Sequence, residues 1–311
     1  MNNYLSRFKG TIIAFVVFIL LLGSLFLLET EKPADIEAEK VFPGLKPEEI
    51  DSIQIVYPES EILLQREENG WSLATGSGRY KADSGVVQNL IEDVTGMEVE
   101  KNLSGDNIDL GEYGFVNSEA EFTVTTPDSD YPVIIGNGSP VGTGTYLYDL
   151  GDGRILIVKD HYLWAFLDKE PFDFREKKLV DLPHGKVNRA QIKVGDFSIE
   201  LRKEKDRWVA ADIPEPGAVD QKKIYDLITT YSELEAGGFE NDNPEGLDAY
   251  GLDAPTAEIG LYTDGQASVI SFGKRKDEDD YYIKVSSDNS IYSVSKDYFK
   301  KLPRNIDQIR D

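Results

Sequence analysis

The glycine-rich stretch "GNGSPVGTGTY", which begins at Gly136, is the part of the chain that most resembles a phosphate-binding loop. Such a loop needs a helix directly after it, because the helix N-terminus supplies the backbone N–H donors. The residues that follow, "TYLYDL", are instead typical of a strand. The pattern therefore predicts a connection between two strands of a hairpin and no cofactor site.

Acidic clusters at 149–153, 240–248 and 277–280 could attract cations. The stretch "ENDNPEGLD" at 240–248 is spaced loosely like a calcium loop, but Pro244 interrupts it and Leu252 stands at the twelfth position, where an acidic ligand is needed. Cysteine is absent and the two histidines form no HExxH pattern, which argues against zinc. We expect solvated turns and assign no metal ligand, with weak cation binding as the alternative.

Catalytic residues cannot be assigned from the spacing of the remaining polar side chains. His161 and His184 are the histidines, and no G-x-S-x-G pattern marks a serine nucleophile, so a Ser-His-Asp triad stays an open alternative. Carboxylate pairs carry no information among 57 acidic residues. Five tyrosines could stack on sugars, but we expect half-buried strand faces instead. They are Tyr146, Tyr148, Tyr281, Tyr282 and Tyr292.

The formal net charge of the chain is −24. A chain this acidic repels the phosphate backbone, so we expect no nucleic-acid partner. Solubility explains the charge most simply, and a preference for cations or for a basic partner is the alternative.

The N-terminal run at 11–28 contains 18 residues that are apolar except for Thr11, Gly23 and Ser24. As a helix it would extend about 27 Å, close to the hydrocarbon core of a bilayer. We interpret it as an uncleaved transmembrane signal-anchor, with a cleaved signal peptide as the rival.

Charges on either side of this run indicate its orientation. Arg7 and Lys9 precede it and acidic residues follow, so residues 1–10 are expected in the cytoplasm and the body outside the cytoplasm. The charged, proline-containing stretch at 29–47 is interpreted as a stalk linker.

The rest of the chain repeats itself. A shift of 137 positions superposes Trp71 on Trp208 and Asp83 on Asp220, and a shift of 136 superposes Ile155 on Ile291. Further pairs lie at the same shifts: Val87 with Ile224, Leu90 with Leu227, Ile91 with Ile228, Gly136 with Gly273, Val158 with Val294 and Tyr162 with Tyr298. We therefore predict two homologous domains, 48–184 and 185–311.

Each copy predicts the same order of elements. A first strand and a charged hairpin are followed by one long helix, at 81–97 and at 218–234, with Asp83 and Asp220 as N-caps. Three or four strands and a short terminal helix follow. The predicted fold class is α+β, with two tandem domains of mainly antiparallel sheets and one long helix each, preceded by a single transmembrane helix.

A Tyr-Gly-apolar motif recurs at 113–115 and 250–252. In the second copy we expect a helical turn from Leu247 to Tyr250 that stops at Gly251, because glycine adopts the left-handed conformation easily. Leu252 would then fold back on Leu247. The motif is thus interpreted as a structural cap and not as a binding site.

The motifs "DAYGLDAP" and "KEPFDFREKKLVDL" give the chain a resemblance to the bacterial domain-of-unknown-function 4340 family, over about residues 48–311. The resemblance implies a membrane anchor and an association with ABC-type transport components of the gliding-motility kind. It implies no catalytic residue.

These observations favour a non-enzymatic accessory or binding protein of the bacterial cell envelope, anchored in the membrane with its body outside the cytoplasm. Its expected partners are the membrane and the permease and ATPase proteins of a transport system. The alternatives are an envelope hydrolase or polysaccharide-processing enzyme and a stand-alone protein that binds a small molecule between the two copies.

Overall fold

The computed structural model describes residues 38–76, 78–103, 109–140, 144–210 and 219–310, together with Phe18 and Gly142. The predicted cytoplasmic segment 1–10, all of the predicted span 11–28 except Phe18, and residues 29–37 of the predicted stalk 29–47 lie outside the described residues. In the described remainder of that stalk, Val41, Phe42 and Leu45 are buried in the first core, so this part belongs to the first body and is not a linker. Within the described part, no helix combines the length and the apolar character needed to cross a bilayer.

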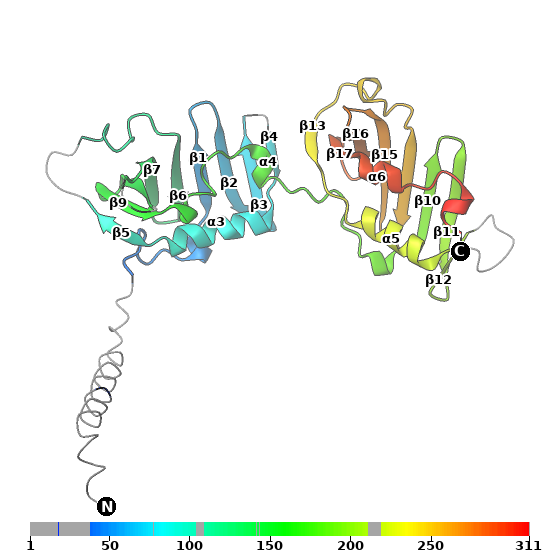
Figure 1. Ribbon diagram of the computed structural model, residues 1–311, viewed down its shortest axis with the longest axis horizontal. Helices are drawn as coiled ribbons and strands as arrows, with labels where there is room; N and C mark the ends of the chain where they lie inside the picture. Colours follow the sequence, from blue (N-terminus) through cyan, green and yellow to red (C-terminus); the bar gives the residue numbers. More distant parts are fainter. Residues whose placement is uncertain are drawn as a thin grey trace, which may run out of the picture.

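The described chain forms two antiparallel sheets (Figure 1). The first has the strand order β4-β3-β2-β1-β6-β7-β8-β9-β5. Its strands are β1 Ser52–Val56, β2 Glu61–Glu67, β3 Gly70–Thr75, β4 Gly78–Lys81, β5 Val99–Asn102, β6 Ala120–Thr125, β7 Asp130–Gly138, β8 Gly144–Asp149 and β9 Arg154–Lys159.

The second sheet has the order β12-β11-β10-β14-β15-β16-β17-β13. Its strands are β10 Arg189–Val194, β11 Phe197–Glu204, β12 Arg207–Ala210, β13 Gly238–Asn241, β14 Ala257–Tyr262, β15 Ala267–Arg275, β16 Asp280–Val285 and β17 Ile291–Ser295. Apart from β4, every strand of the first sheet has a counterpart in this order. The shared topology agrees with the internal repeat.

The helices alternate with these strands in the same way in both halves. The α-helices are α3 Ser84–Gly96, α4 Pro171–Phe174, α5 Gln221–Ser232 and α6 Lys296–Lys301. The 3-10 helices are η1 Pro47–Glu49, η2 Asp160–Tyr162, η3 His184–Lys186, η4 Asp248–Tyr250 and η5 Ile306–Gln308. The prediction of two mainly antiparallel sheets with one long helix each is confirmed.

Both long helices begin at the predicted N-caps. Asp83 Oδ1 accepts hydrogen bonds from the backbone N–H groups of Gly85 and Val86, at 2.9 and 3.1 Å. Asp220 makes the same bonds with Lys222 and Lys223. These bonds satisfy donors that a helix leaves unpaired at its first turn.

Replacing Asp83 by alanine is therefore expected to destabilise the first repeat by about 1 kcal/mol. Urea unfolding of the full chain measures the change. Asp83→Asn is the matched control, because an asparagine side chain still accepts the hydrogen bond.

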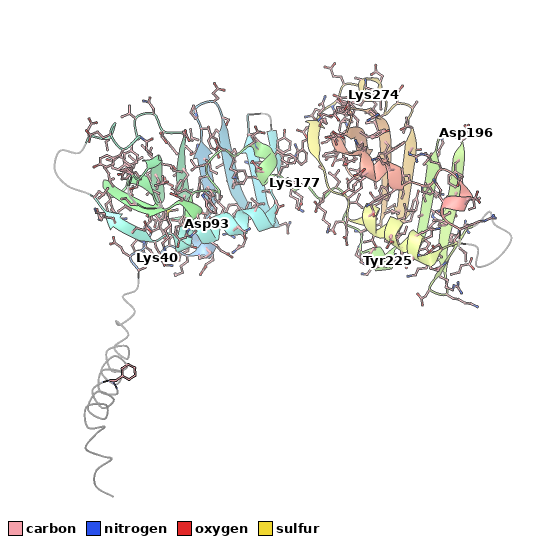
Figure 2. The ribbon with its side chains drawn as sticks, viewed as in Figure 1. Lys40, Asp93, Lys177, Asp196, Tyr225 and Lys274 are labelled. Atoms are coloured by element: carbon pink, nitrogen blue, oxygen red, sulfur yellow. The ribbon has the colours of Figure 1, made fainter. Side chains whose placement is uncertain are left out.

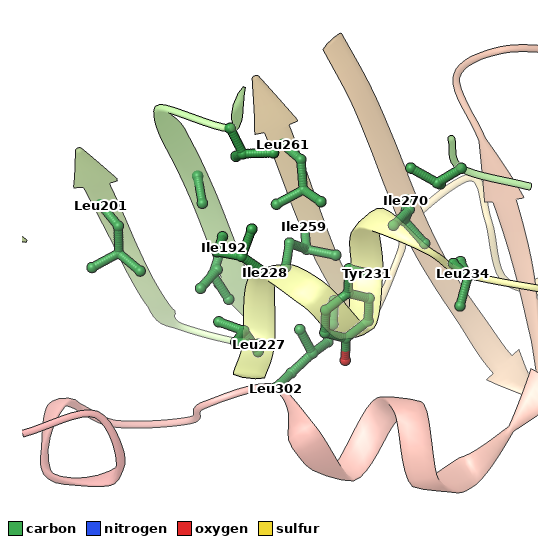
Figure 3. Packing of buried hydrophobic residues seen from close by; sticks show 14 of the residues in the cluster. Ile192, Leu201, Leu227, Ile228, Tyr231, Leu234, Ile259, Leu261, Ile270 and Leu302 are labelled. Carbon is green, nitrogen blue, oxygen red and sulfur yellow. The ribbon is translucent and has the colours of Figure 1, made fainter. Parts of the chain in front are cut away.

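Each sheet packs one face against its long helix. In the second repeat, Leu227, Ile228 and Tyr231 of α5 pack beside residues of β10, β14 and β15, as Figure 3 shows, and Ile224 of α5 is buried in the same core. In strands such as β1 and β10, buried residues alternate with more exposed ones, which is typical of an antiparallel sheet with one solvated face. Leu179, Val180 and Leu182 pack with the second core. Packing thus places the start of the second body near residue 179, whereas the predicted boundary was 184/185.

Candidate functional site: the junction between the repeats and a lysine-lined groove

The glycine-rich stretch at Gly136 lies where β7 turns into β8. The two strands pair in antiparallel register, and Ser139 N donates to Gly144 O at 2.7 Å. The predicted hairpin connection is confirmed. A β-bulge at Ile135–Gly138 accommodates the extra residues.

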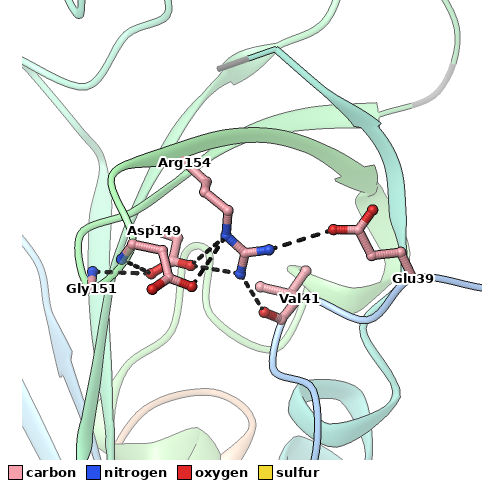
Figure 4. Close-up of polar contacts among 6 residues, drawn as sticks. Glu39, Val41, Asp149, Gly151 and Arg154 are labelled. Carbon is pink, nitrogen blue, oxygen red and sulfur yellow. Dashed lines mark hydrogen bonds and ion pairs between the residues drawn. The ribbon is translucent and has the colours of Figure 1, made fainter. Parts of the chain in front are cut away.

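The acidic clusters are engaged in local structure. Asp277 Oδ1 accepts from the N–H groups of Asp279 and Asp280, at 2.7 and 2.9 Å, and these two hydrogen bonds lower the pKa of Asp277. The buried carboxylate of Asp149 forms an ion pair of 2.8 Å with Arg154, which also donates to the carbonyl of Val41 (Figure 4). Among the described residues, no group of three or more His, Asp or Glu side chains is arranged to hold a metal ion.

His184 lies between a carboxylate and a hydroxyl group. Its Nδ1 is 3.5 Å from Glu233 Oε1, and its Nε2 is 3.2 Å from the hydroxyl of Tyr225. The order carboxylate–imidazole–hydroxyl is that of a catalytic triad, but all three side chains are exposed to water. A triad needs a buried carboxylate within hydrogen-bond distance. We therefore assign this array no catalytic role. No sequence pattern indicated this array, because His184 belongs to η3 whereas Tyr225 and Glu233 belong to α5 and its C-cap, about 40–50 residues further along the chain.

The five tyrosines singled out in the sequence pack against other side chains of the protein. The rings of Tyr146 and Tyr113 meet edge to face at 4.8 Å, and those of Tyr282 and Tyr250 do the same at 5.1 Å in the second repeat. The other three tyrosines also have aromatic partners: Tyr148 with Phe115, Tyr281 with Phe299 and Tyr292 with Phe239. These contacts explain the tyrosines as packing residues.

The Tyr-Gly-apolar motif ends the 3-10 helix η4 in the second copy, as predicted, and closes a hydrogen-bonded turn in the first copy. Gly251 has φ +67° and Gly114 has φ +85°, both in the left-handed region. Leu252 N donates to Leu247 O at 3.0 Å, and Phe115 N donates to Leu110 O at 3.2 Å. Leu252 thus folds back on Leu247 through a backbone bond that closes the turn.

Gly251→Ala is expected to destabilise the second repeat by about 1 kcal/mol or more, because alanine resists this φ and its Cβ would lie 2.8 Å from Lys274 N. Urea unfolding followed by tryptophan fluorescence measures the loss. Gly265→Ala is the control, since its Cβ would meet no atom within 4 Å. Equal stability of the two variants would contradict the capping role.

The chain that joins the two repeats is hydrogen-bonded on both sides. On the first repeat, Asp83 N donates to Phe174 O and Glu176 N donates to Lys81 O. On the second, Ala236 N donates to Lys177 O. The junction is thus held by backbone pairing to each body and is not a free linker.

Arg175 occupies the centre of this junction. Its guanidinium lies over the ring of Tyr80 in the first repeat, at 3.8 Å, and over the ring of Phe239 in the second, at 3.9 Å. Its two terminal nitrogens donate to both carboxylate oxygens of Asp242, at 2.5 and 3.1 Å. The side chain is only 12% exposed. Planar stacking and bidentate pairing suit arginine and not lysine.

The pKa of Asp242 is lowered. Burial alone would raise it, but hydrogen bonds from Arg175 and Tyr80 together with the charge of Arg175 outweigh burial. A carboxyl with a lowered pKa in the folded state contributes stability above its unfolded pKa of about 4, and this contribution is lost as the pH falls through the folded value.

We therefore expect the junction to weaken only below about pH 4. The dependence of the unfolding free energy on pH in that range should be smaller in Asp242→Asn than in the unchanged chain, because asparagine does not titrate. Equal pH dependence of the two proteins would contradict an ion pair at the junction.

The junction was not found from the sequence. The sequences "FRE" at 174–176 and "IRD" at 309–311 resemble each other, and Asp220 N donates to Ile309 O just as Asp83 N donates to Phe174 O. Yet Arg310 is exposed, whereas Arg175 is enclosed. The enclosing residue Phe239 corresponds to Asn102 in the other copy. The junction therefore depends on residues that the two repeats do not share.

A second feature is a groove of about 720 Å³ between α5 and the segment at 300–309. Its apolar lining residues are Leu227, Leu302, Pro303 and Ile309. Lys223, Lys300, Lys301, Tyr225 and Asp226 also line it. The buried Oγ1 of Thr229, another lining residue, has no hydrogen-bond partner among the described residues. The groove combines apolar surface with lysine in a strongly acidic protein.

The sequence model of one family matches most of the chain. That family is described as "Domain of unknown function (DUF4340)", and its model matches residues 71–248 and 212–311. The chain belongs to the DUF4340 family. No curated protein matches it.

The two matches to the DUF4340 model overlap at 212–248 and together reach from Trp71 to the C-terminus. The second match begins shortly before α5, and the first contains α3. Two segments of one family model in one chain are consistent with tandem DUF4340 copies, as the repeat at shifts of 137 and 136 predicted.

Proposed function

We propose that this DUF4340 chain is a membrane-anchored, extracytoplasmic accessory or binding component of an ABC-type transport or other cell-envelope system. The anchor and its orientation come from the apolar run at 11–28 and the charges beside it. The transport association is what the family resemblance implies.

The observation that carries a binding role is the enclosed Arg175. It links Tyr80 of the first repeat to Phe239 and Asp242 of the second, so that one enclosed side chain restrains the two repeats relative to each other. Fixed relative placement of two domains lowers the entropy lost when a partner contacts both. A scaffold protein that binds several partners would therefore lose less entropy on binding them.

The alternative of a ligand cleft between the repeats is less well supported. Arg175 fills the space between Tyr80 and Phe239, and Phe172 meets Phe239 at 5.6 Å. The rings of Tyr80 and Phe239 therefore already stack on a protein side chain, that of Arg175. A small molecule would have to displace a bidentate ion pair to reach them.

Co-purification tests the proposal. The full chain, tagged at its C-terminus and expressed from its own promoter, is extracted in mild detergent and captured. The recovered proteins are then quantified against a tagged chain in which residues 48–311 are replaced by an unrelated soluble domain. We expect permease and ATPase proteins to be enriched with the natural body. Recovery of the chain alone, or equal recovery with the control, would contradict an accessory role.

A further inference from the structure

The described chain starts on the side of the molecule that carries the two long helices. Lys40 Nζ donates to Thr95 O near the end of α3, and Val41 N donates to Met97 O. In Figure 2, Lys40, Asp93 and Tyr225 lie along the lower side of the two repeats, whereas Lys274 and Asp196 lie on the upper side. The chain entry and the α5 groove, which Tyr225 lines, therefore share one side.

The proposed anchor brings this side close to the bilayer. Nine residues, 29–37, separate the end of the predicted span from the first residue of the continuous described chain. Nine residues extend over at most about 30 Å. A tether this short keeps the chain entry, and the helix side on which it lies, within about 30 Å of the end of the predicted span.

The C-terminal segment that lines the α5 groove has the opposite charge to the chain as a whole. Residues 300–310 contain four basic side chains and one acidic side chain, although the whole chain carries −24. The basic ones are Lys300, Lys301, Arg304 and Arg310. Lys222 and Lys223 on α5 are balanced by their ion-pair partners Asp226 and Asp220, and Lys300 pairs with Asp297. The excess of positive charge therefore comes from Lys301, Arg304 and Arg310. Anionic lipid headgroups attract such a cluster and repel the remaining surface.

The equivalent position in the first repeat also suits a lipid surface. Lys300 corresponds to Trp164 at the shift of 136, and Trp164 is 67% exposed. Tryptophan is enriched at the level of lipid headgroups. The fold does not require either residue, because the two repeats keep the same core while these positions differ. The two repeats therefore carry different residues at one place, and both residue types favour a membrane interface.

We propose that the α5 groove, with its lysines, docks on anionic phospholipid headgroups, and that Trp164 makes a second contact with the same membrane. The inference rests on the proposed membrane anchor. An acidic peptide would match the lysines equally well, but it would not account for the exposed Trp164 on the equivalent surface of the first repeat.

The absence of cysteine allows a direct test with single labels. Tyr225→Cys and Asp196→Cys are introduced separately into the full chain, labelled with a nitrobenzoxadiazole fluorophore and reconstituted into vesicles. The vesicles contain phosphatidylcholine with or without phosphatidylglycerol and a lipid that carries a nitroxide on its headgroup. The charge-reversal variant Lys300→Glu/Lys301→Glu is compared with Lys193→Glu/Lys274→Glu, which changes the net charge equally.

With phosphatidylglycerol, we expect headgroup quenching at position 225 to exceed that at position 196 by about threefold or more. The difference should be lost in pure phosphatidylcholine and in Lys300→Glu/Lys301→Glu, and retained in Lys193→Glu/Lys274→Glu. Equal quenching at positions 225 and 196 would overturn the docking proposal but would leave the anchor unaffected. Protection of the label at position 225 only when an acidic peptide is added would have the same consequence. A chain that does not float with the vesicles would contradict the anchor itself.

Discussion

In the Arg175→Ala variant, the two repeats are expected to unfold in two separate transitions. In the wild-type chain, they are expected to unfold together in one transition. The substitution removes the stacked guanidinium between Tyr80 and Phe239 and leaves the carboxylate of Asp242 without its bidentate partner. A double-mutant cycle of Arg175→Ala and Asp242→Ala should give a coupling energy of about 1–3 kcal/mol.

The matched control for this cycle is Arg202→Ala with Glu200→Ala. That pair has a contact of the same length, 2.5 Å, but Arg202 is exposed. Exposed ion pairs contribute about 0–1 kcal/mol, so the control cycle should show little coupling. Two transitions in the unchanged chain, or a coupling at Arg175 no larger than at Arg202, would show that the junction does not join the repeats.

Gly273→Ala is expected to destabilise the second repeat by about 2 kcal/mol or more, which exceeds the expected effect of Gly251→Ala. A Cβ at Gly273 would lie 2.2 Å from the backbone oxygen of Tyr250 and 2.9 Å from Leu252 Cγ. The first contact cannot be relieved by rotating a side chain, because it is with the backbone of the capped turn. The turn would have to move off the β15 bulge on which it rests.

Urea unfolding measures this loss, with Gly265→Ala as the control in the same repeat. Gly136→Ala offers a parallel test in the first repeat, where the added Cβ would lie 2.3 Å from Tyr113 O. The internal duplication predicts that both glycine substitutions destabilise their own repeat. A stable Gly273→Ala variant would mean that the turn does not pack against the bulge.

Sequence reasoning succeeded where one segment determines its own structure. Asp83 and Asp220 stand directly before periodic apolar residues, and an N-cap needs only the N–H groups of its own helix. The Tyr-Gly-apolar motif was predictable for the same reason, since the turn closes within six residues. The duplication made these predictions stronger, because each was made twice from independent residues.

The junction and the groove could not be predicted in this way. Arg175 acquires its role from Tyr80, Phe239 and Asp242, which lie 64 or more residues away in the sequence, and a one-dimensional pattern does not indicate such contacts. The groove arises where α5 packs beside residues 300–309. Alignment of the two repeats could have indicated the groove. The position of Trp164 in the first repeat is Lys300 in the second, whereas most core positions are apolar in both.

The central claim is that the two DUF4340 repeats are held as one body. Double electron–electron resonance tests this claim most directly, because it measures the distance between two nitroxide labels. The labels are attached at Gln88→Cys on α3 and Lys222→Cys on α5, which are both exposed helical positions. The unchanged junction should give one narrow distance distribution, and Arg175→Ala should broaden it. A broad distribution in the chain with Arg175 intact, indistinguishable from that of Arg175→Ala, would contradict the claim.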